Sequence, residues 1–150
     1  MDLLLWRHAE AKEGSPDHIR ELTPKGFKQA EKVANFLRQH LPADSRILVS
    51  PTVRTRQTVS ALTDQFSLVP TIAPGAAAAE VLSAAGWPDS AGTVLVVGHQ
   101  PTLGSVAAQL LECDSYSLSV KKGALWWFSH RESDGAARAT LRLVISPDFL

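Results

Sequence analysis

The feature that most constrains this chain is an apolar run near its start, Leu3–Trp6, which ends abruptly at Arg7 and His8. Four bulky apolar residues without polar alternation are typical of a strand that is covered on both faces of a sheet. Ligands of α/β folds bind at the carboxyl ends of such strands. We therefore expect Arg7 and His8 at a binding crevice. The Arg offers a planar donor fork that matches phosphate or carboxylate oxygens, and the His can serve as nucleophile, general base or metal ligand.

The same pattern recurs in the apolar run Thr93–Val97, which ends at Gly98, His99 and Gln100. Two parallel buried strands that both carry His at their carboxyl ends would bring the two imidazoles to one crevice. Gly98 would let backbone or ligand approach closely, because it has no side chain. The repetition favours a binding site over a solvated strand end.

A third apolar run, Ile47–Val49, is followed by a helix-start signal. Ser50 is a natural N-cap and Pro51 suits the first helical position, so the spacing predicts a helix from this point to about residue 64. Arg54 then lies about one turn into the helix, where it can point back at the crevice. Arg56 lies about 200° further round the helix, which places it on the surface and too far away to share the site.

Hydrophobic periodicity and turn signals predict the other elements of the chain. A helix starts at Thr23 and Pro24, and its apolar face contains Phe27, Ala30, Ala34, Leu37 and Leu41. A short strand is predicted at Leu68–Ile72, and further helices at Ala76–Ala85 and from Thr102 to about Leu111. Two strands, Ala124–Phe128 and Thr140–Ile145, are joined as a hairpin by the turn-like Glu132–Gly135. Val53, Leu62 and Phe66 are the expected core contacts of the helix that carries Arg54. We predict a single three-layer α/β/α domain over residues 1–150, with a mostly parallel central sheet and the C-terminal hairpin as an antiparallel edge.

The composition excludes several classes of partner. A chain of 150 residues is long enough to bury a real core. Its 15 Lys and Arg balance 15 Asp and Glu, so any affinity for anions must be local. The single Cys113 cannot form an internal disulfide, no run approaches the roughly 20 apolar residues of a membrane span, and the start has no signal-peptide pattern. We expect a cytoplasmic protein, a monomer, with no nucleic acid or membrane as a partner.

Taken together, these motifs resemble those of the histidine phosphatase superfamily and, within it, of the short SixA-type phosphohistidine phosphatases. The matching residues come in the family's order between residues 3 and 100: Arg7-His8-Ala9-Glu10-Ala11, Leu22-Thr23-Pro24-Lys25-Gly26, Ser50-Pro51 with Arg54 and Gln57-Thr58, and Val97-Gly98-His99. Ala9 stands where the wider superfamily usually has Gly, a variation that the SixA-type branch tolerates. The resemblance implies the same α/β architecture and a phosphatase activity.

The resemblance also implies the roles of the site residues. His8 would attack a phosphoryl group and form a phosphohistidine intermediate, which water then hydrolyses. Arg7 and Arg54 would bind the phosphoryl oxygens. Asp17-His18-Ile19-Arg20 is similar to a SixA-type Asp-x-x-Arg motif, so Arg20 is a third candidate ligand. We expect no cofactor and no metal, because the arginines already supply the positive charge.

His99 would hydrogen-bond the same phosphoryl oxygens, and Gly98 and Gln100 beside it are expected to contribute to substrate binding. The helix that starts at Thr102 begins next to His99, so free backbone N–H groups at its amino end would favour an anion. The positive neighbours should lower the pKa of His8 from its reference value of about 6.5 and keep the imidazole neutral.

The expected substrate is phosphohistidine on a protein domain. No carboxylate lies in a general-acid motif, and a phosphorylated imidazole needs no dedicated proton donor. Larger members of the superfamily use a carboxylate from the region of Glu80, but Glu80 matches none of their motifs and is kept only as a candidate general acid. The alternatives are a phosphatase for small phosphate esters and a non-catalytic phosphate or phosphopeptide binder. A metal site of His8, His99 and Glu10 or Asp17 lacks the ligand spacing of metal motifs.

Overall fold

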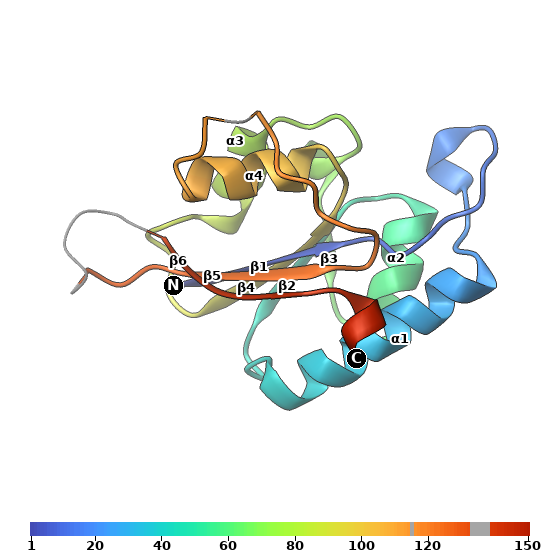
Figure 1. Cartoon of the computed structure of the whole chain (residues 1–150), viewed down its shortest axis with the longest axis horizontal. Coiled ribbons are helices and arrows are strands. Elements are labelled where there is room, and N and C mark those ends of the chain that lie inside the picture. The colour runs from blue at the N-terminus through green and yellow to red at the C-terminus, as the bar shows by residue number, and fades with distance from the viewer. Residues whose placement is uncertain (115, 133–138) are drawn as a thin grey trace.

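The computed structural model describes residues 1–114, 116–132 and 139–150, which form three layers (Figure 1). The middle layer is a six-stranded sheet in the order β3-β2-β4-β1-β5-β6. Its strands are β1 (Asp2–Arg7), β2 (Arg46–Val49), β3 (Ser67–Leu68), β4 (Thr93–Gly98), β5 (Leu125–Ser129) and β6 (Thr140–Ile145). The first four strands pair in parallel, whereas β5 pairs antiparallel with both β1 and β6. The predicted mostly parallel sheet with an antiparallel C-terminal edge is confirmed.

Helices cover both faces of the sheet (Figure 1). The helices α1 (Pro24–His40) and α2 (Val53–Ser60) lie on one face, and α3 (Ala78–Ala85) and α4 (Thr102–Leu110) lie on the other. Short 3₁₀ helices are found at η1 (Asp17–Ile19), η2 (Pro70–Ile72) and η4 (Pro147–Phe149). Within the described residues, no helix combines the length and the hydropathy that a membrane crossing needs.

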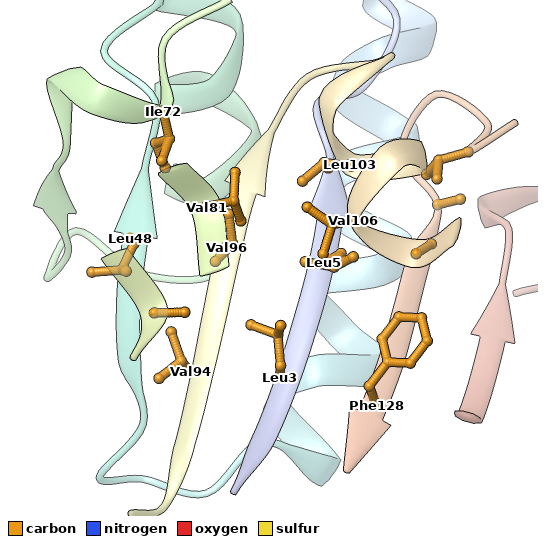
Figure 2. Close-up of a cluster of buried hydrophobic side chains, with 14 residues drawn as sticks. Leu3, Leu5, Leu48, Ile72, Val81, Val94, Val96, Leu103, Val106 and Phe128 are labelled. Carbon is orange, nitrogen blue, oxygen red and sulfur yellow. The ribbon is translucent and has the colours of Figure 1, made fainter. Parts of the chain in front are cut away.

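The central position of β1 explains its unbroken apolar run. Leu3–Trp6 is completely buried, because successive side chains point to opposite faces and each face is covered by helices. Leu3 and Leu5 pack with α3 and α4 (Figure 2), and Leu4 and Trp6 pack with α1 and α2.

The register of β1 and β4 places the two predicted strand ends side by side. Trp6 pairs with Val97, and Arg7 pairs with Gly98. His8 and His99 are the next residues of the two strands, so both imidazoles reach the same edge of the sheet. The expectation that two parallel strands deliver a histidine each is confirmed.

Helix α1 begins as predicted. The Thr23 hydroxyl accepts a hydrogen bond from the Gly26 N–H at 2.9 Å, which caps the first turn, and Pro24 occupies the first position. The prediction was wrong for Phe27, which is largely exposed. The buried face instead contains Gly26, Ala30, Val33, Ala34 and Leu37.

Helix α2 begins later and ends earlier than predicted. Its N-cap is Thr52 rather than Ser50, because the Ser50 hydroxyl is engaged by a histidine ring described below. The helix ends at Ser60, and the chain then turns. Val53 was expected to contact the core, but Val59 is the fully buried apolar residue of α2. Leu62 and Phe66 pack against the core as predicted.

Two further differences concern strands. The predicted strand Leu68–Ile72 is reduced to Ser67–Leu68, because Pro70 lacks an N–H for the ladder and starts η2 instead. The hairpin of β5 and β6 is present. Of its predicted turn Glu132–Gly135, residues 133–135 lie outside the described residues.

Candidate active site

His8 is held in a defined orientation at the end of β1. Its backbone N–H donates to the Gly98 carbonyl oxygen at 3.1 Å, and its side chain is buried. Its Nδ1 lies 2.7 Å from the carbonyl oxygen of Ala9. Because a carbonyl oxygen can only accept, Nδ1 carries the ring hydrogen of the neutral imidazole. The other ring nitrogen, Nε2, therefore has a free lone pair, as a nucleophile requires.

The surroundings of His8 keep its ring neutral. Burial, the largest cause, and the positive charges of Arg54, Arg7 and Arg20 together lower the pKa of His8 to about 4, against the opposing effect of the Ala9 hydrogen bond. The sequence-based expectation had the right direction. Its stated cause, the arginines, is secondary to burial.

Arg54 and Arg20 both donate hydrogen bonds to the carboxylate of Asp17. The buried Arg54 donates from Nη1 to the carbonyl oxygen of Asp17 at 2.9 Å and from Nη2 to the Asp17 carboxylate at 3.0 Å. Arg20 donates from Nε to the other carboxylate oxygen of Asp17, also at 3.0 Å. The hydrogen bond from Arg54 is the main reason why the pKa of Asp17 is lowered. Asp17 thus remains ionised and is bound by both arginines.

His99 faces His8 across the end of the sheet. The two ring centroids are 5.3 Å apart, and Nε2 of His99 lies 2.7 Å from the hydroxyl oxygen of Ser50. Burial, followed by the influence of His8 and Arg54, lowers the pKa of His99 to about 3. His99 is therefore neutral at physiological pH.

Three buried polar atoms in this site have no hydrogen-bond partner among the described residues. They are Nε of Arg7, Nε of Arg54 and Nδ1 of His99. Buried polar groups are normally hydrogen-bonded, so three such atoms in one place are unusual. A tetrahedral oxyanion offers the acceptors that the two guanidinium groups lack.

These side chains line a cavity of about 370 Å³. Its lining comprises Arg7, His8, Ala11, Glu13, Asp17, Arg20, Arg54, Pro74, His99, Gln100 and Lys122. The structure therefore brings together Arg7, His8, Arg20, Arg54, His99 and Gln100 of the predicted set. Gly98 and Glu80 are absent from the described residues that line the cavity, and Glu80 is exposed. Arg56 is exposed on α2, as the helix geometry predicted.

Gly98 and Gln100 both form hydrogen bonds within the protein. The Gly98 carbonyl oxygen accepts from the His8 N–H. A Cβ at Gly98 would lie 3.5 Å from the Leu103 side chain, which is ordinary contact, so no close approach requires this glycine. The Gln100 amide donates to the Leu118 carbonyl oxygen at 2.6 Å and accepts from the Gly104 N–H at 2.9 Å. The N–H of Leu103 donates to the His99 carbonyl oxygen. The N–H groups of Leu103 and Gly104 in the first turn of α4 are thus already used, although free N–H groups were expected at the amino end of this helix.

Sequence reasoning assigned no role to three motif residues that fix the loop after His8. The Thr58 hydroxyl accepts from the Ala9 N–H at 3.1 Å, and the Gln57 side chain accepts from the Leu22 N–H at 2.8 Å. A Cβ at Gly26 would lie 2.0 Å from the Glu10 carbonyl oxygen, so only glycine lets α1 approach this loop. The motif residues Gln57, Thr58 and Gly26 are therefore positioning residues.

The alternative metal site gains no support. Among the described residues, no group of three or more His, Cys, Asp or Glu side chains is arranged to hold a metal ion. The Glu10 carboxylate accepts from the Thr23 hydroxyl at 2.8 Å, and the Asp17 carboxylate is bound by two arginines.

Known proteins resemble this chain in sequence and in fold. A protein of Mycobacterium tuberculosis without an assigned activity is 34% identical over 111 residues, which cover 69% of this chain and 68% of that protein. Phosphohistidine phosphatase SixA of Escherichia coli is 28% identical over 121 residues, covering 73% and 74% of the two chains. A solved SixA-like structure from Nakamurella multipartitia superimposes with a TM-score of 0.78 at 34% identity, and covers 97% of this chain and 95% of its own.

The sequence model of the histidine phosphatase superfamily (branch 1) matches residues 3–86. This range contains Arg7, His8, Arg20 and Arg54, four of the residues that line the cavity. The chain belongs to the histidine phosphatase superfamily.

Proposed function

We propose that this protein removes phosphate from phosphohistidine on a protein domain, with His8 as the covalent carrier. The observation that carries the proposal is the 2.7 Å contact between Nδ1 of His8 and the Ala9 carbonyl oxygen. It fixes the tautomer in which Nε2 is unprotonated, within a cavity that Arg7, Arg20 and Arg54 also line.

In the first step, Nε2 of His8 attacks the phosphorus atom, and the bond from phosphorus to the substrate imidazole breaks. The substrate histidine leaves as a neutral imidazole, because its far ring nitrogen takes up a proton from water. In the second step, water attacks the phosphorus on His8, which yields inorganic phosphate and neutral His8. The net reaction consumes one water molecule and no other co-reactant.

The arginines stabilise the charge that both steps spread over the phosphoryl oxygens. The Nε atoms of Arg7 and Arg54 are buried donors without a partner among the described residues, and each would gain one in the transition state. If the Ser50 hydroxyl donates its hydrogen bond to Nε2 of His99, the neutral His99 ring carries its hydrogen on Nδ1. Nδ1 of His99 then donates to a phosphoryl oxygen. The planar forks suit these oxygens better than a point charge.

The choice of substrate rests on Asp17, the carboxylate that binds the arginines of the cavity, and on the relatives. Asp17 is ionised through its bond to Arg54 and cannot donate a proton at neutral pH. A phosphate ester needs such a donor, whereas a neutral imidazole leaves without one. The E. coli relative is a phosphohistidine phosphatase, which supports the same substrate class.

Rapid quench with a ³²P-labelled phosphohistidine domain tests the proposal. We expect label on the enzyme that survives alkali and is lost in acid, and that is absent from His8→Ala. An unlabelled wild type that still turns over would contradict the covalent route. A wild type that hydrolyses phosphoserine peptides or sugar phosphates faster than the phosphohistidine domain would contradict the substrate.

A further inference from the structure

A second hollow lies directly beside the catalytic cavity. It has a volume of about 640 Å³ and lies between α1, the segment 119–122 and η4. Arg7 and Lys122 line both this groove and the catalytic cavity. Whatever occupies the groove is therefore a neighbour of the phosphoryl group on His8.

The groove concentrates positive charge in a chain whose formal net charge is zero. The sequence contains six lysines, and five of them line the groove: Lys25, Lys28, Lys32, Lys121 and Lys122. The first three recur at helical spacing on one face of α1, away from its buried face. Together with Arg7, six cationic side chains face two carboxylates, those of Glu10 and Asp148. We call this surface the lysine groove.

The charges of the lysine groove are not neutralised within the protein. In the described part of the chain, none of the five lysines forms an ion pair, and each is exposed. The Glu10 carboxylate is in addition engaged by the Thr23 hydroxyl. Clustered like charges repel each other, and an acidic partner relieves that repulsion. Single exposed pairs contribute little, but a row of them steers association.

We propose that the lysine groove binds an acidic surface segment of the protein that carries the phosphohistidine. This inference rests on the proposed function and names a recognition surface for it. The shared residues Arg7 and Lys122 make the groove continuous with the catalytic cavity, so one protein can fill both. The described lining includes no aromatic side chain on which a nucleic-acid base could stack. These features favour an acidic protein over a nucleic acid.

A matched pair of charge reversals tests the proposal. Lys32→Glu changes an exposed residue of α1 inside the groove, and Arg56→Glu makes the same change of charge on an exposed residue of α2 outside it. Neither residue belongs to the catalytic cavity. The two probes are a phosphorylated histidine-containing phosphotransfer domain with a net negative charge and free phosphohistidine, which has no protein segment that could bind the groove.

We expect Lys32→Glu to lower kcat/KM for the domain roughly 10-fold, mainly through KM, and to leave free phosphohistidine unchanged. Arg56→Glu should change neither substrate. Raising the ionic strength to about 0.5 M should bring the wild type close to Lys32→Glu, because the Debye length falls below about 5 Å. The activity on free phosphohistidine also shows that each variant is folded.

Equal losses on the two substrates, or equal behaviour of the two variants on the domain, would overturn the proposal. Salt-sensitive binding of a mixed-sequence RNA oligonucleotide that Lys32→Glu abolishes, with unchanged turnover of the domain, would assign the groove to nucleic acid. Failure of the proposed function looks different, since the wild type would then form no labelled intermediate or would hydrolyse a phosphate ester faster than the domain, whatever the effect of Lys32→Glu.

Discussion

The carboxylate of Asp17 forms an ion pair with the guanidinium of Arg54 in the catalytic cavity, with Oδ2 3.0 Å from Nη2. The Arg54 side chain is 4% exposed, whereas that of Asp17 is 57% exposed. The second carboxylate oxygen binds Arg20. An acidic side chain of the protein therefore occupies donors of two arginines that we assign to the phosphoryl group, and it competes with that group for them.

Asp17→Asn should bind inorganic phosphate more tightly than the wild type. An ion pair with one exposed partner contributes about 0.2–1 kcal/mol, so Kd should fall by at most roughly fivefold. The carbonyl oxygen of Asp17 keeps its 2.9 Å contact with Arg54, which preserves the local backbone. Isothermal titration calorimetry measures the effect, with Arg56→Ala as the control. Weaker binding would mean that the carboxylate chiefly positions the arginines.

Arg54→Ala should lose at least about 100-fold in kcat/KM, the typical effect of removing one donor to a developing charge. Arg56→Ala should stay within about twofold, because its side chain is exposed on another face of α2. Steady-state kinetics on one phosphohistidine substrate measure both. Equal losses would mean that phosphoryl binding does not follow the orientation of α2.

Sequence patterns predicted the parts of the fold that depend on local apolar runs. The runs in β1 and β4 predicted two buried parallel strands, and the register of Arg7 with Gly98 confirms that their ends meet. The start of α2 was predicted wrongly, because Ser50 and Thr52 are both good N-caps. Only the fold shows that the Ser50 hydroxyl is used by His99.

Other features of the site depend on contacts between distant segments, which no local pattern carries. Asp17 was predicted as part of the Arg20 motif and as a ligand of the alternative metal site, but the hydrogen bond that most affects its carboxylate comes from Arg54 on α2. The lysine groove likewise joins Lys32 on α1 to Lys121, which lie far apart in the sequence. Burial of His8 could not be weighed against the arginines before the depth of the cavity was known.

Gly26→Ala should destabilise the protein by about 1–3 kcal/mol and lower activity, because its Cβ would lie 2.0 Å from the backbone oxygen of Glu10. The clash would displace the loop that follows His8. Gly98→Ala is the matched control, since its Cβ meets the Leu103 side chain at 3.5 Å. Urea denaturation compares the two. Equal destabilisation would show that the close approach at Gly26 is easily relaxed.

The free energy of unfolding should decrease as the pH falls below about 6.5. An imidazole of the unfolded chain takes up a proton near pH 6.5, whereas His8 and His99 in the folded chain do so only near about 4 and about 3. Between pH 6.5 and the pKa of the folded imidazole, each of the two residues lowers the free energy of unfolding by up to about 1.4 kcal/mol per pH unit. Above about pH 6.5 neither residue changes it. Denaturant titrations at pH 7 and pH 5 should show a smaller loss for His8→Ala. An identical loss would mean that the folded His8 titrates near its ordinary pKa.

Glu80→Gln should leave the hydrolysis of phosphohistidine unchanged, and Glu13→Gln should lower it less than about threefold. Glu80 is exposed and does not belong to the described lining of the cavity, whereas Glu13 does. An alkoxide leaving group gains about 10²- to 10⁴-fold from a positioned acid, but a neutral imidazole leaves without one. With Asp17 ionised by Arg54, kcat/KM should therefore be far higher for a phosphohistidine domain than for phosphoserine peptides or sugar phosphates. Faster hydrolysis of an ester that either Gln variant abolishes would identify that carboxylate as the general acid of a small-ester phosphatase.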